Sequence, residues 1–184
     1  MDKQDSGKQS WKMFKSRIGE ALIEELLNQA GNKVRRFGQE WRTTAFQELS
    51  PAIFQWVNLS ERFRMKPDLA ILNREGKVQG IEVKFLRTEE HLSYLDEKKY
   101  FEKLKTHWPG TQVIIVTLEP STVVHLNKCH IQVLDPSDID QDNYYFRCPI
   151  YNIDEWGVTK KLCANYEQLI RKLPADELIN RSAY

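Results

Sequence analysis

The sequence predicts one α/β domain in which helices flank a mixed β-sheet. Three patterns support this fold class: an amphipathic stretch at residues 16–30, two apolar runs joined by a turn at 69–72 and 78–85, and an apolar run at 112–118 that follows a helical segment. The joined runs predict an antiparallel hairpin. A strand, a helix and a further strand in succession predict a right-handed crossover to a parallel neighbour. The expected order is αβββαβ over a core of about residues 16–118, within a single domain of residues 1–184.

The composition is that of an ordinary soluble globular domain. The chain has 184 residues, of which 41% are hydrophobic and 29% charged, and its net charge is +1. Bulk charge therefore does not mark a polyanion-binding protein. The charge is uneven, however: residues 61–87 hold seven basic and four acidic residues, whereas residues 135–155 hold six acids and one arginine. Positive charge near the hairpin suits local contacts with phosphate.

Cysteine usage and the N-terminal residues indicate a cytoplasmic protein. The three cysteines are irregularly spaced, which argues against a disulfide framework. The N-terminal residues are polar and no apolar run approaches the ~20 residues that span a bilayer. His125, Cys129 and His130 match no zinc-binding template.

The first predicted helix covers residues 16–30, after a frayed polar lead at residues 1–9. Its apolar side chains recur at helical spacing on one face: Ile18, Leu22, Ile23, Leu26, Leu27 and Ala30. Gly31 is suited to stop it. Glu24 is expected to point to water, whereas Glu20 and Glu25 flank the apolar face. A carboxylate at that edge could reach a site on the sheet.

A first strand is expected within residues 33–41, where Glu40 is interpreted as a solvated strand end. Residues 43–60 form an insert before the hairpin, with short helical turns separated by Pro51.

The hairpin determines which side chains share a face. Gly76 can adopt the positive φ of its turn. If the turn is centred on Glu75, Asp68 lies directly opposite Glu82 in the hairpin. Their Cβ atoms would then be roughly 4.5–5.5 Å apart. Lys84 shares the face of Glu82 because strand side chains alternate.

After the hairpin, a helix is expected at residues 90–106. Its apolar side is formed by Leu92, Leu95, Tyr100, Phe101 and Leu104. A turn at Pro109-Gly110 then leads to the strand at 112–118, which is apolar enough to be covered on both faces. Further along, we expect a helical turn at 123–126, a strand at 130–134, a turn at 135–138 and a last helix at 166–173.

The predicted hairpin gathers chemistry suited to a hard cation. Two close carboxylates require a counter-charge, which Lys84 supplies in part. Mg²⁺ favours one or two protein carboxylates together with water and phosphate oxygens, and it can promote phosphodiester hydrolysis. An ordinary hairpin with an exposed salt bridge fits the same spacing.

Pro67-Asp68, the hairpin and Glu82-Val83-Lys84 together resemble the signature of the PD-(D/E)XK nuclease superfamily. That superfamily has the restriction-endonuclease-like fold and includes Holliday junction resolvases and many type II restriction enzymes. The resemblance covers about residues 16–118. It implies an αβββαβ core with an insert before the catalytic hairpin and an extension at about 119–184.

The resemblance also implies roles for individual residues. Asp68 and Glu82 would hold one or two Mg²⁺ ions, which Mn²⁺ could replace, with help from the backbone carbonyl of Val83. Glu20 matches the helical glutamate that often precedes the first strand in the superfamily. Lys84 would orient water and offset phosphoryl charge. Neighbouring carboxylates favour its protonated form, so it is not expected to be the general base.

The expected partner is nucleic acid, most simply double-stranded or branched DNA. Arg64, Lys66 and Arg87 are the predicted phosphate contacts. Many relatives act as homodimers, so a homodimer is one expected arrangement. Three alternatives stay open: a catalytically silent DNA-binding or assembly subunit of the same fold, an RNA-cleaving nuclease, and an interaction domain that uses the acidic stretch at 135–155.

Overall fold

The computed structural model describes residues 3–36, 66–88, 97–139 and 145–173, and these form an α/β fold with a mixed sheet. The sheet has six strands in the order β1-β2-β3-β4-β5-β6. The strands are β1 (Lys33–Arg36), β2 (Leu69–Leu72), β3 (Val78–Leu86), β4 (Gln112–Thr117), β5 (Ile131–Ile139) and β6 (Tyr145–Pro149). The helices are α1 (Lys3–Gln29), α4 (Glu97–His107) and α5 (Lys160–Arg171), with 3₁₀ turns η3 (Val124–Leu126), η4 (Ile150–Asn152) and η5 (Asp154–Trp156).

The strand directions from β1 to β4 follow the predicted topology. The first three strands form an antiparallel meander, β4 pairs parallel to β3, and β5 and β6 continue antiparallel. The parallel β3–β4 step confirms the expected crossover through α4. In the described part of the chain, the elements from α1 to β4 occur in the order αβββαβ.

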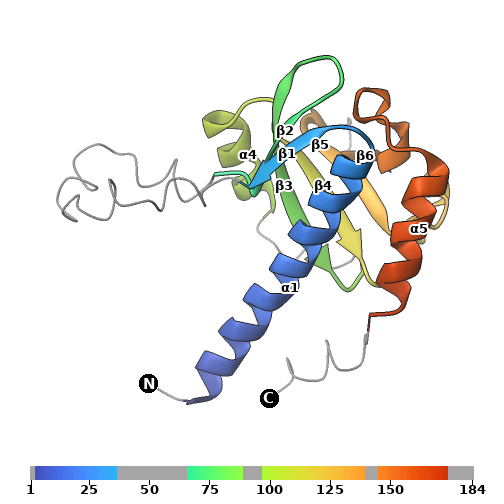
Figure 1. Cartoon of the computed structure of the whole chain (residues 1–184). Coiled ribbons are helices and arrows are strands. Elements are labelled where there is room, and N and C mark those ends of the chain that lie inside the picture. Colours follow the sequence, from blue (N-terminus) through green and yellow to red (C-terminus); the bar gives the residue numbers. More distant parts are fainter. Residues whose placement is uncertain (1–2, 37–65, 89–96, 140–144, 174–184) are drawn as a thin grey trace.

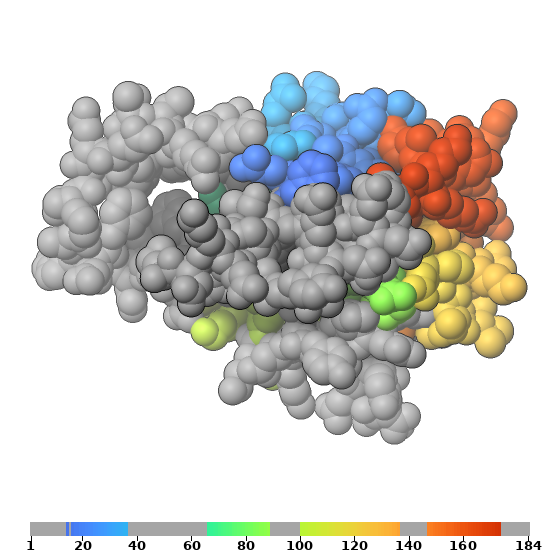
Figure 2. Space-filling model, turned by 90° about the horizontal axis from the view of Figure 1, so that it is seen from below, coloured from blue at the N-terminus to red at the C-terminus, as the bar shows by residue number. Residues whose placement is uncertain are grey.

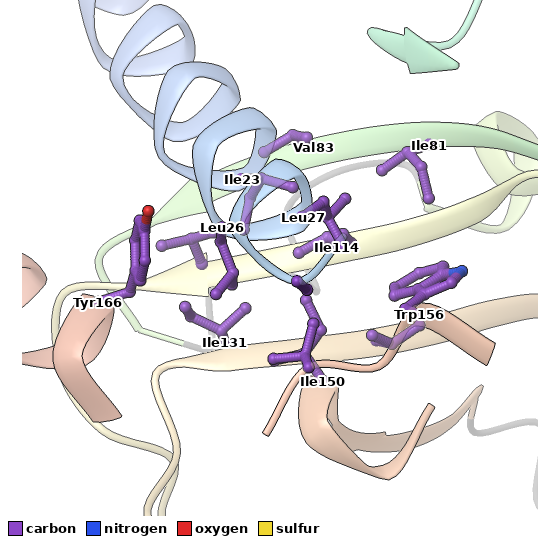
Figure 3. Close-up of a cluster of buried hydrophobic side chains, with 14 of the residues drawn as sticks. Ile23, Leu26, Leu27, Ile81, Val83, Ile114, Ile131, Ile150, Trp156 and Tyr166 are labelled. Atoms are coloured by element: carbon purple, nitrogen blue, oxygen red, sulfur yellow. The ribbon is translucent and has the colours of Figure 1, made fainter. Parts of the chain in front are cut away.

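Helices cover both faces of the sheet (Figure 1). The helices α1 and α5 contact each other on one face, where Figure 2 shows them side by side. Figure 3 shows the apolar cluster on this face, in which Ile23 and Leu26 of α1 lie over strand residues such as Ile114. A second cluster on the other face joins Phe101 and Leu104 of α4 to the sheet. The alternating side chains of β4 supply both clusters, which confirms that β4 is covered on both faces.

The end of α1 lies where the sequence predicted it, whereas the start of α1 lies earlier than predicted. Gly31 has a φ of +92°, and the N–H groups of Gly31 and Asn32 donate to the carbonyls of Asn28 and Leu27, as in a Schellman motif. The helix already begins at Lys3, so the expected frayed lead was wrong for residues 3–9. These residues contain no proline and include lysines and glutamines, which favour helix continuation.

Glu24 does not point freely to water. Its Oε2 lies 2.6 Å from Nε of Arg36, and both side chains are partly buried. The expectation was wrong because the chain turns back directly after α1, so that β1 runs alongside the helix and brings Arg36 next to Glu24.

Two expectations for the C-terminal part also need correction. Asp135–Asp138 lies within β5 instead of forming a turn. Pro136 is tolerated there because pairing with β4 ends at Leu134 and the pairing with β6 shifts register between Leu134 and Ile139. The last helix starts at Lys160, six residues before the predicted start at Tyr166.

Several expected features lie outside the described residues: the insert at 43–60, Glu40, and the first part of the helix predicted at 90–106. Across the described ranges, we find no helix with the length and apolar character needed to cross a membrane.

Candidate active site

The β2–β3 hairpin has the register that the sequence predicted. Leu69 pairs with Ile81 and Ala70 pairs with Gly80, and Gly76 in the turn has a φ of +79°. Asp68 is the residue just before β2, so it lies beyond the last pair, beside the continuing strand β3. This register brings Asp68 to the level of Glu82.

A hydrogen bond of Asp68 and the packing of its neighbour Pro67 fix the position of Asp68. Its Oδ2 accepts a hydrogen bond of 2.8 Å from the backbone N–H of Val83. The preceding Pro67 is buried against β3 at Gly80, where a Cβ would lie 2.9 Å from Cγ of Pro67 and 2.6 Å from Oγ1 of Thr111. Glycine at position 80 therefore leaves the room that Pro67 needs, two residues before Glu82 on the same face of the strand.

The backbone of Val83 faces the same edge as Asp68. In an extended strand, the N–H and C=O of one residue are directed toward the same neighbour. Because the N–H of Val83 donates to Asp68, its carbonyl oxygen also points to this edge, where β2 has ended. The geometry agrees with the ligand role that the resemblance implies for this carbonyl.

Glu82 is the most deeply buried acid of the site, with 4% of the residue exposed. Its Oε1 accepts hydrogen bonds of 2.5 Å from Nζ of Lys84 and of 2.5 Å from the hydroxyl of Tyr100. Its Oε2 is buried and has no hydrogen-bond partner among the described residues. The Glu82–Lys84 ion pair agrees with the prediction that both side chains share one face.

Sequence reasoning missed Tyr100. It was assigned to the apolar side of its helix, but its hydroxyl binds Glu82 and its ring lies under Lys84, with Nζ 4.4 Å from the ring centroid. Burial, and then the negative charge of Glu82, raise the pKa of Tyr100, so its hydroxyl stays protonated and acts as a donor. The sequence offered one signal for this contact: the hydroxyl of a buried tyrosine usually binds a polar partner.

The pKa of Asp68 shows how the acids affect one another. Burial of the carboxyl group, followed by the charge of Glu82, raises this pKa to about 7, although the hydrogen bond from Val83 opposes the shift. The charge of Glu20 raises it further and that of Lys84 lowers it. The site therefore holds more negative charge than Lys84 offsets.

Glu20 approaches this site from the opposite face of the sheet. The helix α1 packs closely on β3 at Gly19, where a Cβ would lie 3.1 Å from Cβ of Phe85. Oε1 of Glu20 accepts a hydrogen bond of 2.9 Å from Oγ of Ser16. The charge of Glu20 acts on the other acids by raising the pKa of Asp68. Asp68 directly precedes β2, at the edge of the sheet.

The predicted phosphate contacts have different surroundings. Lys66 is partly buried and precedes Pro67, next to the site. Arg87 follows β3 and forms an ion pair of 3.0 Å with Glu119, in which both side chains are about half exposed. Arg64 lies outside the described residues.

The residues present fit a hard divalent cation. Mg²⁺ typically binds one or two protein carboxylates and retains several waters. The unpaired Oε2 of Glu82, the carboxyl group of Asp68 and the carbonyl of Val83 supply oxygen ligands of this kind. In the described ranges, no cluster of three or more His, Cys, Asp or Glu side chains is arranged to hold a metal ion.

Of the residues His125, Cys129 and His130, His130 takes part in structural hydrogen bonds. Nδ1 of His130 lies 2.9 Å from the carbonyl oxygen of Thr117, and Nε of Arg171 lies 3.2 Å from Nε2. Because arginine can only donate, Nε2 accepts and Nδ1 carries the proton. Both ring nitrogens of His130 are thus engaged within the protein.

Comparisons of the chain with family models, with curated proteins and with solved structures return no match.

Proposed function

We propose that this chain is a Mg²⁺-dependent endonuclease that hydrolyses phosphodiester bonds in DNA, on a restriction-endonuclease-like core. The observation that supports this most strongly is Glu82, a buried carboxylate with one oxygen held by Lys84 and Tyr100 and the other without a partner in the described part of the chain. The order αβββαβ and the resemblance of the hairpin to the PD-(D/E)XK signature agree with it.

In this proposal, Asp68, Glu82 and the carbonyl of Val83 hold the cation. The bound Mg²⁺ would supply an activated water and stabilise the charge that develops on the phosphoryl oxygens. Glu20, whose charge already acts on Asp68, would assist through a water bound to the cation.

Lys84 would orient the attacking water and offset phosphoryl charge. Its ammonium group lies 2.5 Å from Oε1 of Glu82, so it is held beside the cation site. Lys66 next to the site, with Arg64 and Arg87, would contact the DNA backbone.

Cleavage assays with the purified chain test the proposal. Supercoiled plasmid, linear duplex, branched DNA, single-stranded DNA and RNA are incubated with Mg²⁺ or Mn²⁺, and with EDTA as the control. We expect metal-dependent nicking or linearisation of DNA that EDTA abolishes. Cleavage of RNA alone would reassign the substrate. Salt-dependent binding of DNA without cleavage would favour a silent subunit, and neither binding nor cleavage would contradict the proposal.

A further inference from the structure

The two oxygens of the Glu82 carboxylate have different surroundings. Oε1 accepts two hydrogen bonds of 2.5 Å, whereas the buried Oε2 accepts none from the described residues. Leaving a buried carboxylate oxygen unpaired is costly. The terminal torsion of a glutamate is broad, so the carboxylate could rotate to share its donors if nothing prevented it.

Tyr100 is well placed to prevent that rotation. It comes from α4, which is anchored to the sheet by the buried neighbours Phe101 and Leu104. The rings of Tyr100 and Phe101 meet edge to face, with centroids 5.7 Å apart. The hydroxyl therefore approaches Glu82 from a fixed element, and not from a flexible side chain on the same strand.

Tyr100 also contacts the second donor. The ammonium of Lys84 lies over its ring, 4.4 Å from the centroid, within the range of a cation–π interaction. One side chain thus binds the carboxylate through its hydroxyl and supports the lysine through its ring.

We propose that Tyr100 is a positioning residue that holds Oε1 of Glu82 and Nζ of Lys84, so that Oε2 faces the cation site. This inference rests on the proposed function, because it assigns a purpose to the unpaired oxygen. A partner of this kind, which binds the ligand and not the metal, typically changes metal affinity about 10- to 100-fold when it is removed.

Tyr100→Phe tests the proposal, because it removes the hydroxyl and keeps the ring. We expect Mn²⁺ and Mg²⁺ to bind about 10- to 100-fold more weakly, measured by calorimetric titration and by the signal of free Mn²⁺ in electron paramagnetic resonance. Tyr100→Ala removes the ring as well as the hydroxyl and is expected to bind the metal at least as weakly as Tyr100→Phe. Both variants are measured below the unfolding temperature that each shows without metal.

Tyr151→Phe is the matched control. Tyr151 also has a lysine over its ring, with Nζ of Lys160 5.4 Å from the centroid, but it lies in η4 and does not touch the hairpin acids. We expect its metal affinity to equal that of the wild type.

The outcomes separate the two proposals. If the wild type binds the metal and Tyr100→Phe binds it equally well, the role of Tyr100 is contradicted and the proposed function stands. If Tyr100→Ala binds the metal more tightly than Tyr100→Phe, the ring of Tyr100 does not support Lys84 as proposed. If the wild type binds neither Mn²⁺ nor Mg²⁺, the proposed function itself is contradicted.

Discussion

Glu82→Gln is expected to slow Mg²⁺-dependent DNA cleavage by about 100-fold or more, since a metal ligand contributes several kcal/mol to transition-state stabilisation and each 1.36 kcal/mol is a factor of ten. Glutamine has nearly the same shape and keeps an oxygen that can accept from Lys84 and Tyr100. It replaces the unpaired Oε2 with an amide that binds cations poorly. The measurement is the initial rate of plasmid nicking.

Binding of DNA by Glu82→Gln should stay close to that of the wild type, because phosphate contacts are assigned to other residues. Glu75→Gln is the matched control: Glu75 lies in the turn of the same hairpin and forms an exposed ion pair with Lys77. It should cut DNA at the wild-type rate. Wild-type cleavage by Glu82→Gln would show that the cation site has been placed wrongly.

Asp68→Asn is expected to stabilise the metal-free protein at pH 8. The pKa of Asp68 is about 7 in the folded chain, compared with 3.8 for an aspartate in the unfolded chain. Between these values the folded protein holds a proton that the unfolded chain has released. The free energy of unfolding therefore falls as the pH rises from about 4 to 7, by up to about 4 kcal/mol. Asparagine carries no charge and can still accept from Val83.

The gain should be largest at pH 8 and small at pH 4, measured by urea unfolding in the presence of EDTA. Mg²⁺ should raise the melting temperature of the wild type at pH 8, because it offsets the repulsion among the acids, and should have little effect on Asp68→Asn. Asp154→Asn, at an exposed aspartate in η5, serves as the control. An equal gain at both pH values, or none at pH 8, would contradict the electrostatic account of the site.

The hairpin could be predicted because local chemistry specifies its register. Gly76 permits the turn, and the alternation of β3 then decides which residues face Asp68. The parallel strand β4 was predictable for a similar reason, because its uninterrupted apolar run requires cover on both faces.

Contacts between distant elements were harder to predict. Tyr100 and Glu82 meet only because α4 packs on the face of the sheet formed by β3, β4 and β5. Helical periodicity predicts an apolar face but does not say what the polar atoms of that face bind. The pairing of Glu24 with Arg36 likewise depends on how β1 returns along α1.

The start of α5 was missed although its signal is local. Thr159 caps the helix, and its side chain accepts from the N–H of Leu162. A threonine three residues before the first apolar position is a usual helix start, but Lys160 and Lys161 gave no apolar periodicity.

At Asp135–Asp138, local signals were misleading instead. These turn-forming residues lie in a strand that has a register shift.

The most direct test of the cation site is a crystal structure determined in the presence of Mn²⁺, with anomalous diffraction used to locate the metal. We predict a peak in contact with Oε2 of Glu82 and a carboxylate oxygen of Asp68, beside the carbonyl of Val83. Mn²⁺ bound elsewhere, with Oε2 of Glu82 still lacking a metal, would contradict the account.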